Sequence, residues 1–215
     1  MGNLETLKIR NVLTKDQLYK ELNYVNATRI CRAKYANLII ENLNLITPLL
    51  EILFSDDKKI SPRASWIFEF AVKDDFTIIF PHLDKFINNL STLQIDSAKR
   101  PCIKIIEILI EKYYHKKNSD IIKHLTKQHK EKITEVCFDW MMSEEKVAVK
   151  AYSMNSLYFL GTEFDWIHPE LKTIIERDYS SQGAEDLMKF YFYYYSLILI
   201  KMCLDLALNP ALCEL

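Results

Sequence analysis

The stretch IFPHLDKF, residues 79–86, decides the fold of this 215-residue chain, because its pattern returns along the sequence. An apolar residue stands two positions before the proline, a leucine two after it, and another apolar residue five after it. The pattern recurs around Pro48 and Pro169, and once more at residues 131–136, where Glu131 replaces the proline. The two later apolar positions share one helix face, and proline suits the first turn of a helix. The pattern therefore predicts a repeated helix start.

A basic residue and a second apolar helix follow three of these four copies. The bases are Arg63, Arg100 and Lys150, and the pair Arg32–Ala33 upstream echoes Arg63–Ala64, so that Arg32 is the fourth base of the row. Helix pairs with two apolar faces must stack on their neighbours, which yields a solenoid with roughly 30–45 residues per repeat. We therefore predict an all-α fold, an α-solenoid of about five antiparallel helix pairs. A globular helical bundle is the alternative, but it does not explain the recurring order of proline and base.

The helical pattern extends over most of the chain and predicts one domain, residues 1–215. Its repeat core covers about residues 14–180, and Thr14 with Gln17 has the form of a capping box at the first helix. Residues 115–130 are polar and basic and are predicted to be a loop between repeats. Gly161 is predicted to end a helix as its C-cap. Residues 184–208 are predicted to form a terminal helix that covers the open end of the solenoid.

Composition excludes several classes of function. The chain has only three glycines, so neither a Rossmann nor a P-loop phosphate-binding motif can be written in it, and we predict no cofactor. Its formal net charge of −1 provides no general field to attract nucleic acid. The five cysteines are scattered and predict buried thiols in a reducing compartment, which places the protein in the cytoplasm. Neither the spacing of the histidines nor that of the acidic pairs predicts a metal or catalytic site.

Three groups of side chains are candidates for binding. The first is a basic patch in the predicted loop: Lys116, Lys117, Lys123, Lys127 and Lys130. It is either a docking patch for an acidic partner or a solvated loop. The second group is the tryptophans Trp66, Trp140 and Trp166, which are expected in the core; one that is exposed on the concave side would serve as an anchor for a peptide.

The third group is the row of bases: Arg32, Arg63, Arg100 and Lys150. One interpretation is a ladder between repeats, in which each base pairs with a carboxylate such as Asp57, Asp96 or Glu145. The other is a cationic ridge that receives an acidic peptide. We favour the ladder, because stacked repeats need contacts that hold their register.

Five segments together resemble a known family: ISPRASWIFEF (60–70), FPHLDKFI (80–87), EKITEVCFDW (131–140), KVAVKAYSMNSLYFLG (146–161) and FDWIHPELK (164–172). The chain resembles small HEAT-like, armadillo-type repeat proteins that often carry an adenylosuccinate lyase label. The resemblance implies a right-handed superhelix of helix pairs. We do not carry over the lyase activity, because the mobile-loop signature of such lyases, resembling GSSxMPxKxN, has no counterpart here. The aromatic end, residues 190–208, departs from the family.

From these observations we expect a non-enzymatic interaction module that binds another protein or a peptide. The alternative is a nucleic-acid-binding enzyme related to HEAT-like glycosylases of DNA alkylation repair, which use a strongly basic groove with a carboxylate and aromatic residues. The lyase is a more distant alternative. We expect no nucleic acid as partner, because the net charge is close to zero. We expect no membrane as partner, because Lys201 and Asp205 interrupt the apolar C-terminal stretch. A neutral groove with aromatic residues would favour protein binding over the glycosylase.

Overall fold

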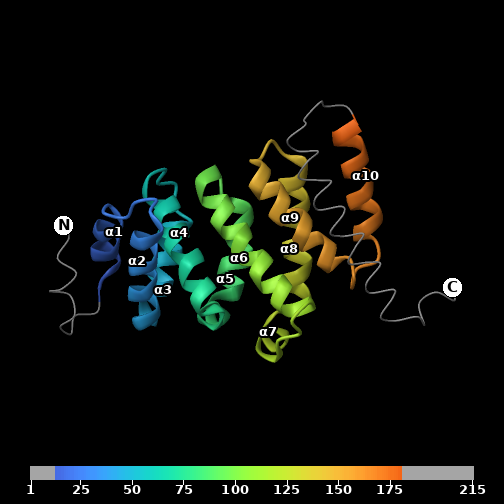
Figure 1. Ribbon diagram of the computed structural model, residues 1–215. Coiled ribbons are helices and arrows are strands. Elements are labelled where there is room, and N and C mark those ends of the chain that lie inside the picture. The colour runs from blue at the N-terminus through green and yellow to red at the C-terminus, as the bar shows by residue number, and fades with distance from the viewer. Residues whose placement is uncertain (1–12, 181–215) are drawn as a thin grey trace. The chain divides into compact units, whose positions relative to one another are not determined.

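The computed structural model describes residues 13–180, and these residues form helices and turns without a β-strand (Figure 1). The α-helices are α1 (Lys15–Leu22), α2 (Arg29–Glu41), α3 (Ile46–Leu53), α4 (Ile60–Asp74), α5 (Leu83–Asn89), α6 (Asp96–Tyr114), α7 (Ser119–His124), α8 (Lys127–Met142), α9 (Val147–Leu160) and α10 (Ile167–Ser180). Short 3-10 helices are η2 (Leu43–Leu45), η3 (Phe76–His82) and η4 (Leu90–Thr92). The predicted fold class, an all-α solenoid of paired helices, is confirmed.

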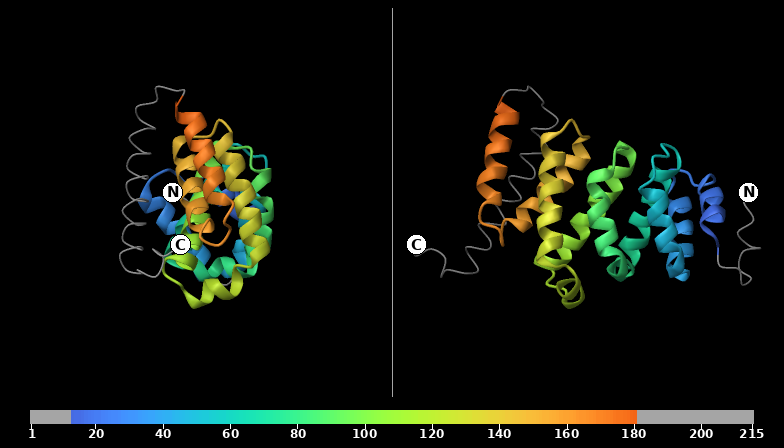
Figure 2. Two further views of the ribbon diagram at one scale, coloured as in Figure 1. Left: turned by 90° about the vertical axis from the view of Figure 1, so that its right-hand side faces the viewer. Right: turned by 180° about the vertical axis from the view of Figure 1, so that it is seen from behind.

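The chain forms two compact units, residues 1–168 and residues 169–215. In the first unit the helix pairs α1–α2, α3–α4, α5–α6 and α8–α9 follow one another in chain order, from blue to yellow in Figure 1. Figure 2 shows the same order from behind. In the second unit the described residues are the part of α10 that follows His168. The proposed covering helix at residues 184–208 lies outside the described residues, so it and the single-domain boundary stay predictions.

Each pair of the first unit contributes one helix to each of two layers. The second helices pack on one another in sequence, α2 on α4, α4 on α6 and α6 on α9. In the layer of first helices, α1 packs on α3 and α5 packs on α8. Because the second helices contact one another along the whole unit, side chains on their outer side form one continuous surface.

The core between the layers is apolar and closely packed. Phe86 of α5 is fully buried, and its ring centroid lies 5.6 Å from that of Phe68 on α4 and 5.9 Å from that of Phe54 at the end of α3. Aromatic rings at these separations add a specific interaction to the area that they bury. Phe86 therefore joins the second and third helix pairs.

Three helix starts, those of α1, α3 and α10, follow the sequence patterns. The Thr14 hydroxyl and the Gln17 side chain form the predicted capping box of α1. Pro48 and Pro169 are each the third residue of their helix, within the first turn, as predicted. The copy at residues 79–86 differs, because Pro81 lies inside η3 and α5 begins two residues later at Leu83.

The predicted loop at residues 115–130 is mostly helical, so that prediction is wrong. Asn118 caps α7 by accepting two backbone N–H bonds, and Thr126 caps α8 in a capping box with His129. Ile121 and Leu125 are buried and anchor this segment to the core. Two caps and two buried apolar side chains overcome the high charge of the segment.

Gly161 follows α9 as the predicted C-cap, but for a different reason than expected. Its φ of −63° lies in the ordinary right-handed region, so the backbone does not require glycine. A Cβ at this position would lie 2.2 Å from the ring of His168, whose Nε2 is 2.8 Å from the Tyr158 carbonyl oxygen. Glycine is therefore needed here for close approach of a side chain.

No single helix within residues 13–180 is both long enough and apolar enough to cross a membrane. Residues 29–53 reach that length and composition only when α2 is combined with the segment Leu43–Leu53, across a bend of 107°.

Phe86→Ala should destabilise the protein strongly, because it leaves a cavity between two helix pairs. We expect a loss of about 3–5 kcal/mol in the free energy of unfolding, measured by urea denaturation. Ile30→Ala is the control, since this side chain is exposed on α2 and should change stability by at most about 0.5 kcal/mol. Equal effects of the two substitutions would contradict the proposed core.

Candidate functional site

Side chains of the second helices line up on one outer surface. On α4, Arg63, Trp66 and Phe70 are three and four residues apart and so share a helix face. Arg100 and Lys104 do the same on α6. All five are exposed or half-buried. We call this surface the second-helix face; its members are Arg32 on α2, Arg63, Trp66, Phe70 and Lys73 on α4, Arg100 and Lys104 on α6, and Tyr152 on α9.

Cations lie over aromatic rings on this face and connect neighbouring second helices. The guanidinium carbon of Arg32 lies 4.8 Å from the ring centroid of Phe70 and 5.9 Å from that of Trp66. Lys104 Nζ lies 4.5 Å from the ring centroid of Tyr152. Such contacts join α2 to α4 and α6 to α9, and each contributes about 0.5–1 kcal/mol at partly exposed sites. The rings stay half-buried and keep part of their surface open.

Two buried carboxylates neutralise the two lysines of the face. Glu69 and Glu107 are only 6% and 4% exposed. Lys73 Nζ bonds to Glu69 on the same helix, and Lys104 Nζ bonds to Glu107. Glu107 Oε1 also accepts a hydrogen bond of 2.7 Å from the Asn155 amide on α9. The lysines therefore add little net charge to the surface.

Two arginines of the face bond to backbone carbonyls instead. Arg32 Nη2 donates to the Ala27 carbonyl oxygen at 2.8 Å. Arg63 Nη1 donates to the carbonyl oxygens of Leu22 and Asn23, at 3.1 and 2.7 Å. The carbonyls of Leu22 and Asn23 lie at the end of α1, where a cation also meets the negative end of the helix dipole. Neither arginine therefore bonds to a carboxylate of a described residue.

The other two predicted bases have no polar partner within residues 13–180. Arg100 is exposed, and Lys150 is half-buried; neither makes a hydrogen bond or an ion pair there. Lys150 precedes Tyr152 by two residues, which turns it about 200° away around α9. The structure thus brings Arg32, Arg63 and Arg100 to one face but leaves Lys150 off it. The predicted pairing with carboxylates is wrong for Arg32 and Arg63, which bond to backbone carbonyls instead, and residues 13–180 provide no carboxylate partner for Arg100 or Lys150.

A buried ion pair of the predicted kind does join two repeats, through a different lysine. Lys99 of α6 bonds through Nζ to Glu145, which lies in the turn before α9, and both side chains are mostly buried. Lys99 precedes Arg100 by one residue and so points to the packed side of the helix. Asp57, another predicted partner, instead accepts from the Tyr19 hydroxyl and from two backbone N–H groups at the start of α4.

The three tryptophans occupy three different environments. Trp140 is buried at 5% exposure, so it belongs to the core and is not an anchor. Trp66 lies half-buried on the second-helix face. Trp166 is 57% exposed before α10 and stacks on Phe138 of α8, with ring centroids 5.6 Å apart. Two of the three candidates therefore present ring surface to solvent.

The predicted basic patch is smaller than its sequence suggests. Lys130 is buried, so it is not part of a solvated patch. Lys116 and Lys127 each lie 3.8 Å from a nearby glutamate, Glu111 and Glu131 respectively. Lys117 and Lys123 are exposed and make no ion pair with another described residue. The remaining charge is spread along α7 and the start of α8.

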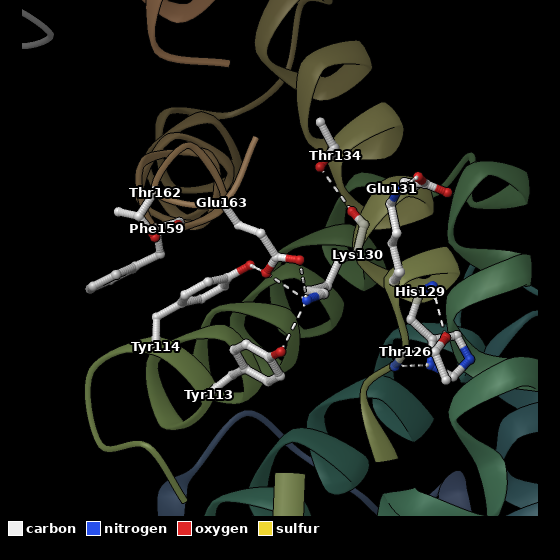
Figure 3. Close-up of polar contacts among 11 residues, drawn as sticks. Tyr113, Tyr114, Thr126, His129, Lys130, Glu131, Thr134, Phe159, Thr162 and Glu163 are labelled. Carbon is white, nitrogen blue, oxygen red and sulfur yellow. Dashed lines mark hydrogen bonds and ion pairs between the residues drawn. The ribbon is translucent and has the colours of Figure 1, made fainter. Parts of the chain in front are cut away.

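Lys130 ties α6, α8 and the segment after α9 together (Figure 3). Its Nζ lies 2.6 Å from both carboxylate oxygens of Glu163 and 3.0 Å from the Tyr113 hydroxyl. The Tyr114 hydroxyl donates to Glu163 Oε2 at 2.7 Å. This arrangement leaves the ammonium fully engaged within the protein.

The ionisation of this cluster reflects its hydrogen bonds. Burial alone would raise the pKa of Glu163, but bonds from Lys130 and Tyr114 outweigh it and hold the pKa below its ordinary value. Burial alone would lower the pKa of Lys130, and the bonds to Glu163 and Tyr113 raise it instead. Both groups are therefore charged at neutral pH.

Burial raises the pKa of Cys102 and Cys137, so both remain thiols at neutral pH and are poor nucleophiles. Residues 13–180 contain no group of three or more His, Cys, Asp or Glu that could hold a metal ion. The second-helix face offers arginine donors and open aromatic rings.

Residues 14–184 match the family description of a HEAT repeat domain. The chain belongs to the HEAT repeat family. Neither curated proteins nor solved structures yielded a match to it. None of these comparisons supports the adenylosuccinate lyase label. The HEAT repeat assignment agrees with the stacked helix pairs of the first unit.

Several side chains that shape this HEAT repeat surface escaped prediction. They are Glu69, Phe70, Lys73, Lys99, Lys104, Glu107 and Tyr152. A usable signal was present for two of them, because Phe70 and Lys104 lie seven and four residues after a predicted arginine, on the same helix face. The burial of the two glutamates depends on neighbouring helices and has no local signal.

In this HEAT repeat domain, Arg63→Ala and Arg100→Ala should differ in stability. Arg63→Ala removes the bonds to the end of α1 and should cost about 1–2 kcal/mol. Arg100→Ala removes no described contact and should change the free energy of unfolding by at most about 0.5 kcal/mol. Urea denaturation measures both. A loss in the Arg100 variant as large as in the Arg63 variant would refute this assignment.

Glu163→Gln should make the stability less sensitive to acid. The folded-state pKa of Glu163 is lowered, so its contribution is present above its ordinary value of 4.5 and is lost as the pH falls through the folded pKa. Since this side chain is 36% exposed, we expect a difference from wild type of only about 1 kcal/mol at pH 7. Thermal melts from neutral to acidic pH should show that difference shrinking. Glu135→Gln, in an exposed pair with Lys132, is the control and should show almost no difference.

Proposed function

We propose that this protein is a non-enzymatic binding module that docks a segment of another protein on its second-helix face. The observation that carries the proposal is the set of half-buried rings on an outer surface, with Trp66 and Phe70 beside Arg32 and Tyr152 beside Lys104. Tryptophan, tyrosine and arginine are the residues that dominate the energy of protein interfaces. Rings that are held by cations from neighbouring helices lose little freedom when a partner binds.

The charge of this face favours a protein over a nucleic acid. A glycosylase-like groove needs uninterrupted positive charge to meet phosphates. Here the buried carboxylates of Glu69 and Glu107 pair with Lys73 and Lys104 and neutralise their charge. The mixture of paired charges and open rings supports protein recognition.

The proposal predicts which tryptophan matters for partner capture. Affinity-tagged protein should recover a partner from the native cell, quantified by mass spectrometry. Trp66→Ala should reduce that recovery about tenfold or more, as for a hot-spot residue. Tyr152→Ala, at the other end of the face, should reduce it as well.

Trp166→Ala is the matched control, because it removes the same kind of side chain from an exposed site outside the second-helix face. Circular dichroism verifies that each variant is folded. The proposal is refuted if folded Trp66→Ala and Tyr152→Ala proteins recover every partner at the wild-type level. It is also refuted if Trp166→Ala loses the partner to the same extent.

A further inference from the structure

The arginines of the second-helix face have spare hydrogen-bonding capacity. A guanidinium carries five N–H donors. Arg32 donates from Nη2 to the Ala27 carbonyl oxygen, its Nε is buried, and its Nη1 makes no hydrogen bond to a described residue. Arg63 donates only from Nη1 to described residues, and Arg100 makes no described hydrogen bond. Unlike the two lysines of the face, none of the three arginines bonds to a carboxylate within residues 13–180.

The second helices as a set carry more positive charge than the first helices. Helices α2, α4, α6 and α9 contain ten Lys or Arg and six Asp or Glu. The first helices α1, α3, α5 and α8 contain six and seven. A chain with a formal net charge of −1 therefore concentrates an excess of positive charge on its second helices. A partner segment of opposite charge complements this layer.

The distance between the helices that carry the arginines determines how far apart the carboxylates of a partner segment must be. Arg32 on α2 and Arg100 on α6 are separated by α4, which packs against both helices. Packed helices lie about 8–10 Å apart, so the axes of α2 and α6, which carry the two arginines, are about 16–20 Å apart. An extended chain covers that distance in about five or six residues. Trp66 and Phe70 lie on α4 between these two helices, and the Arg32 guanidinium lies over both rings.

We propose that the segment docked here is an acidic peptide in an extended conformation. Two of its carboxylates, about six residues apart, are bound by Arg32 and Arg100, and an apolar side chain midway packs on Trp66. Arginine is suited to this task because its planar fork binds a carboxylate with two parallel hydrogen bonds. The inference rests on the proposed function and adds the chemistry of the partner.

The test is an NMR titration of the full chain with a synthetic peptide. The peptide has glutamates at its ends about six residues apart, a leucine midway and serines elsewhere, and is added to about 2 mM. The indole N–H signal of Trp66 should shift saturably, and that of Trp166 should not. A peptide of the same composition with adjacent glutamates should bind about tenfold more weakly, which corresponds to about 1.4 kcal/mol.

Arg100→Glu and Lys132→Glu make the same change in net charge at different places. Arg100 lies on the second-helix face without a described contact, whereas Lys132 lies on α8 and pairs with Glu135. Arg100→Glu should weaken peptide binding about tenfold, and a peptide with one terminal glutamate replaced by lysine should restore it. Lys132→Glu should change affinity less than about twofold.

Three results would overturn the inference: no saturable shift at Trp66, equal losses for the two charge-reversed variants, or tighter binding of a single-stranded oligonucleotide at the same Trp66 signal. These results are separable from the proposed function. If Trp66→Ala abolishes partner capture while Arg100→Glu affects neither capture nor peptide binding, the docking face stands and the acidic partner does not.

Discussion

The packing of α4 against both α2 and α6 is the constraint on which the rest of the structure depends. One side of α4 is lined by fully buried side chains, among them Ala64, Phe68 and Ala71, so the small residues let neighbouring backbones approach. Its outer side carries Trp66 and Phe70 in the middle of the second-helix face. Because solenoid repeats contact only their neighbours, a helix that touches two others transmits the register of the stack. The same contact therefore fixes both the fold and the geometry of the proposed binding surface.

The sequence predicted the fold well, because helix starts and helix faces are encoded by residues only a few positions apart. The repeated proline pattern placed α3 and α10, and the capping box of Thr14 marked α1 to the residue. The failure at residues 115–130 has a physical cause. Lysine-rich composition suggested a solvated loop, but caps at Asn118 and Thr126 satisfy the helix ends locally, and buried Ile121 holds the segment in place.

The proposed binding surface was less predictable, because neighbouring residues on a helix face different directions. Lys99 and Arg100 are adjacent, yet one forms a buried ion pair with Glu145 while the other is exposed. A step of one residue turns a side chain by about 100°, and the sequence alone does not show where the neighbouring helix lies. The same reason explains why Lys150, which was predicted to lie in the row of bases, lies outside the second-helix face. The second helices and their arginines could be located from the sequence. Which group each base contacts within the protein depends on tertiary packing.

The contact of Arg63 with the end of α1 bears on how the protein opens. Terminal repeats of a solenoid commonly fray first, since they are supported on one side only. Here α1 packs on both α3 and α4, and Arg63 binds the carbonyls of Leu22 and Asn23 across about 40 residues of sequence. Helix α1 is thereby fixed to the second helix pair, α3 and α4, by both packing and hydrogen bonds. The amides of α1 and α4 should then exchange with solvent as one cooperative unit, so that the N-terminal edge of the repeat array behaves as part of its interior.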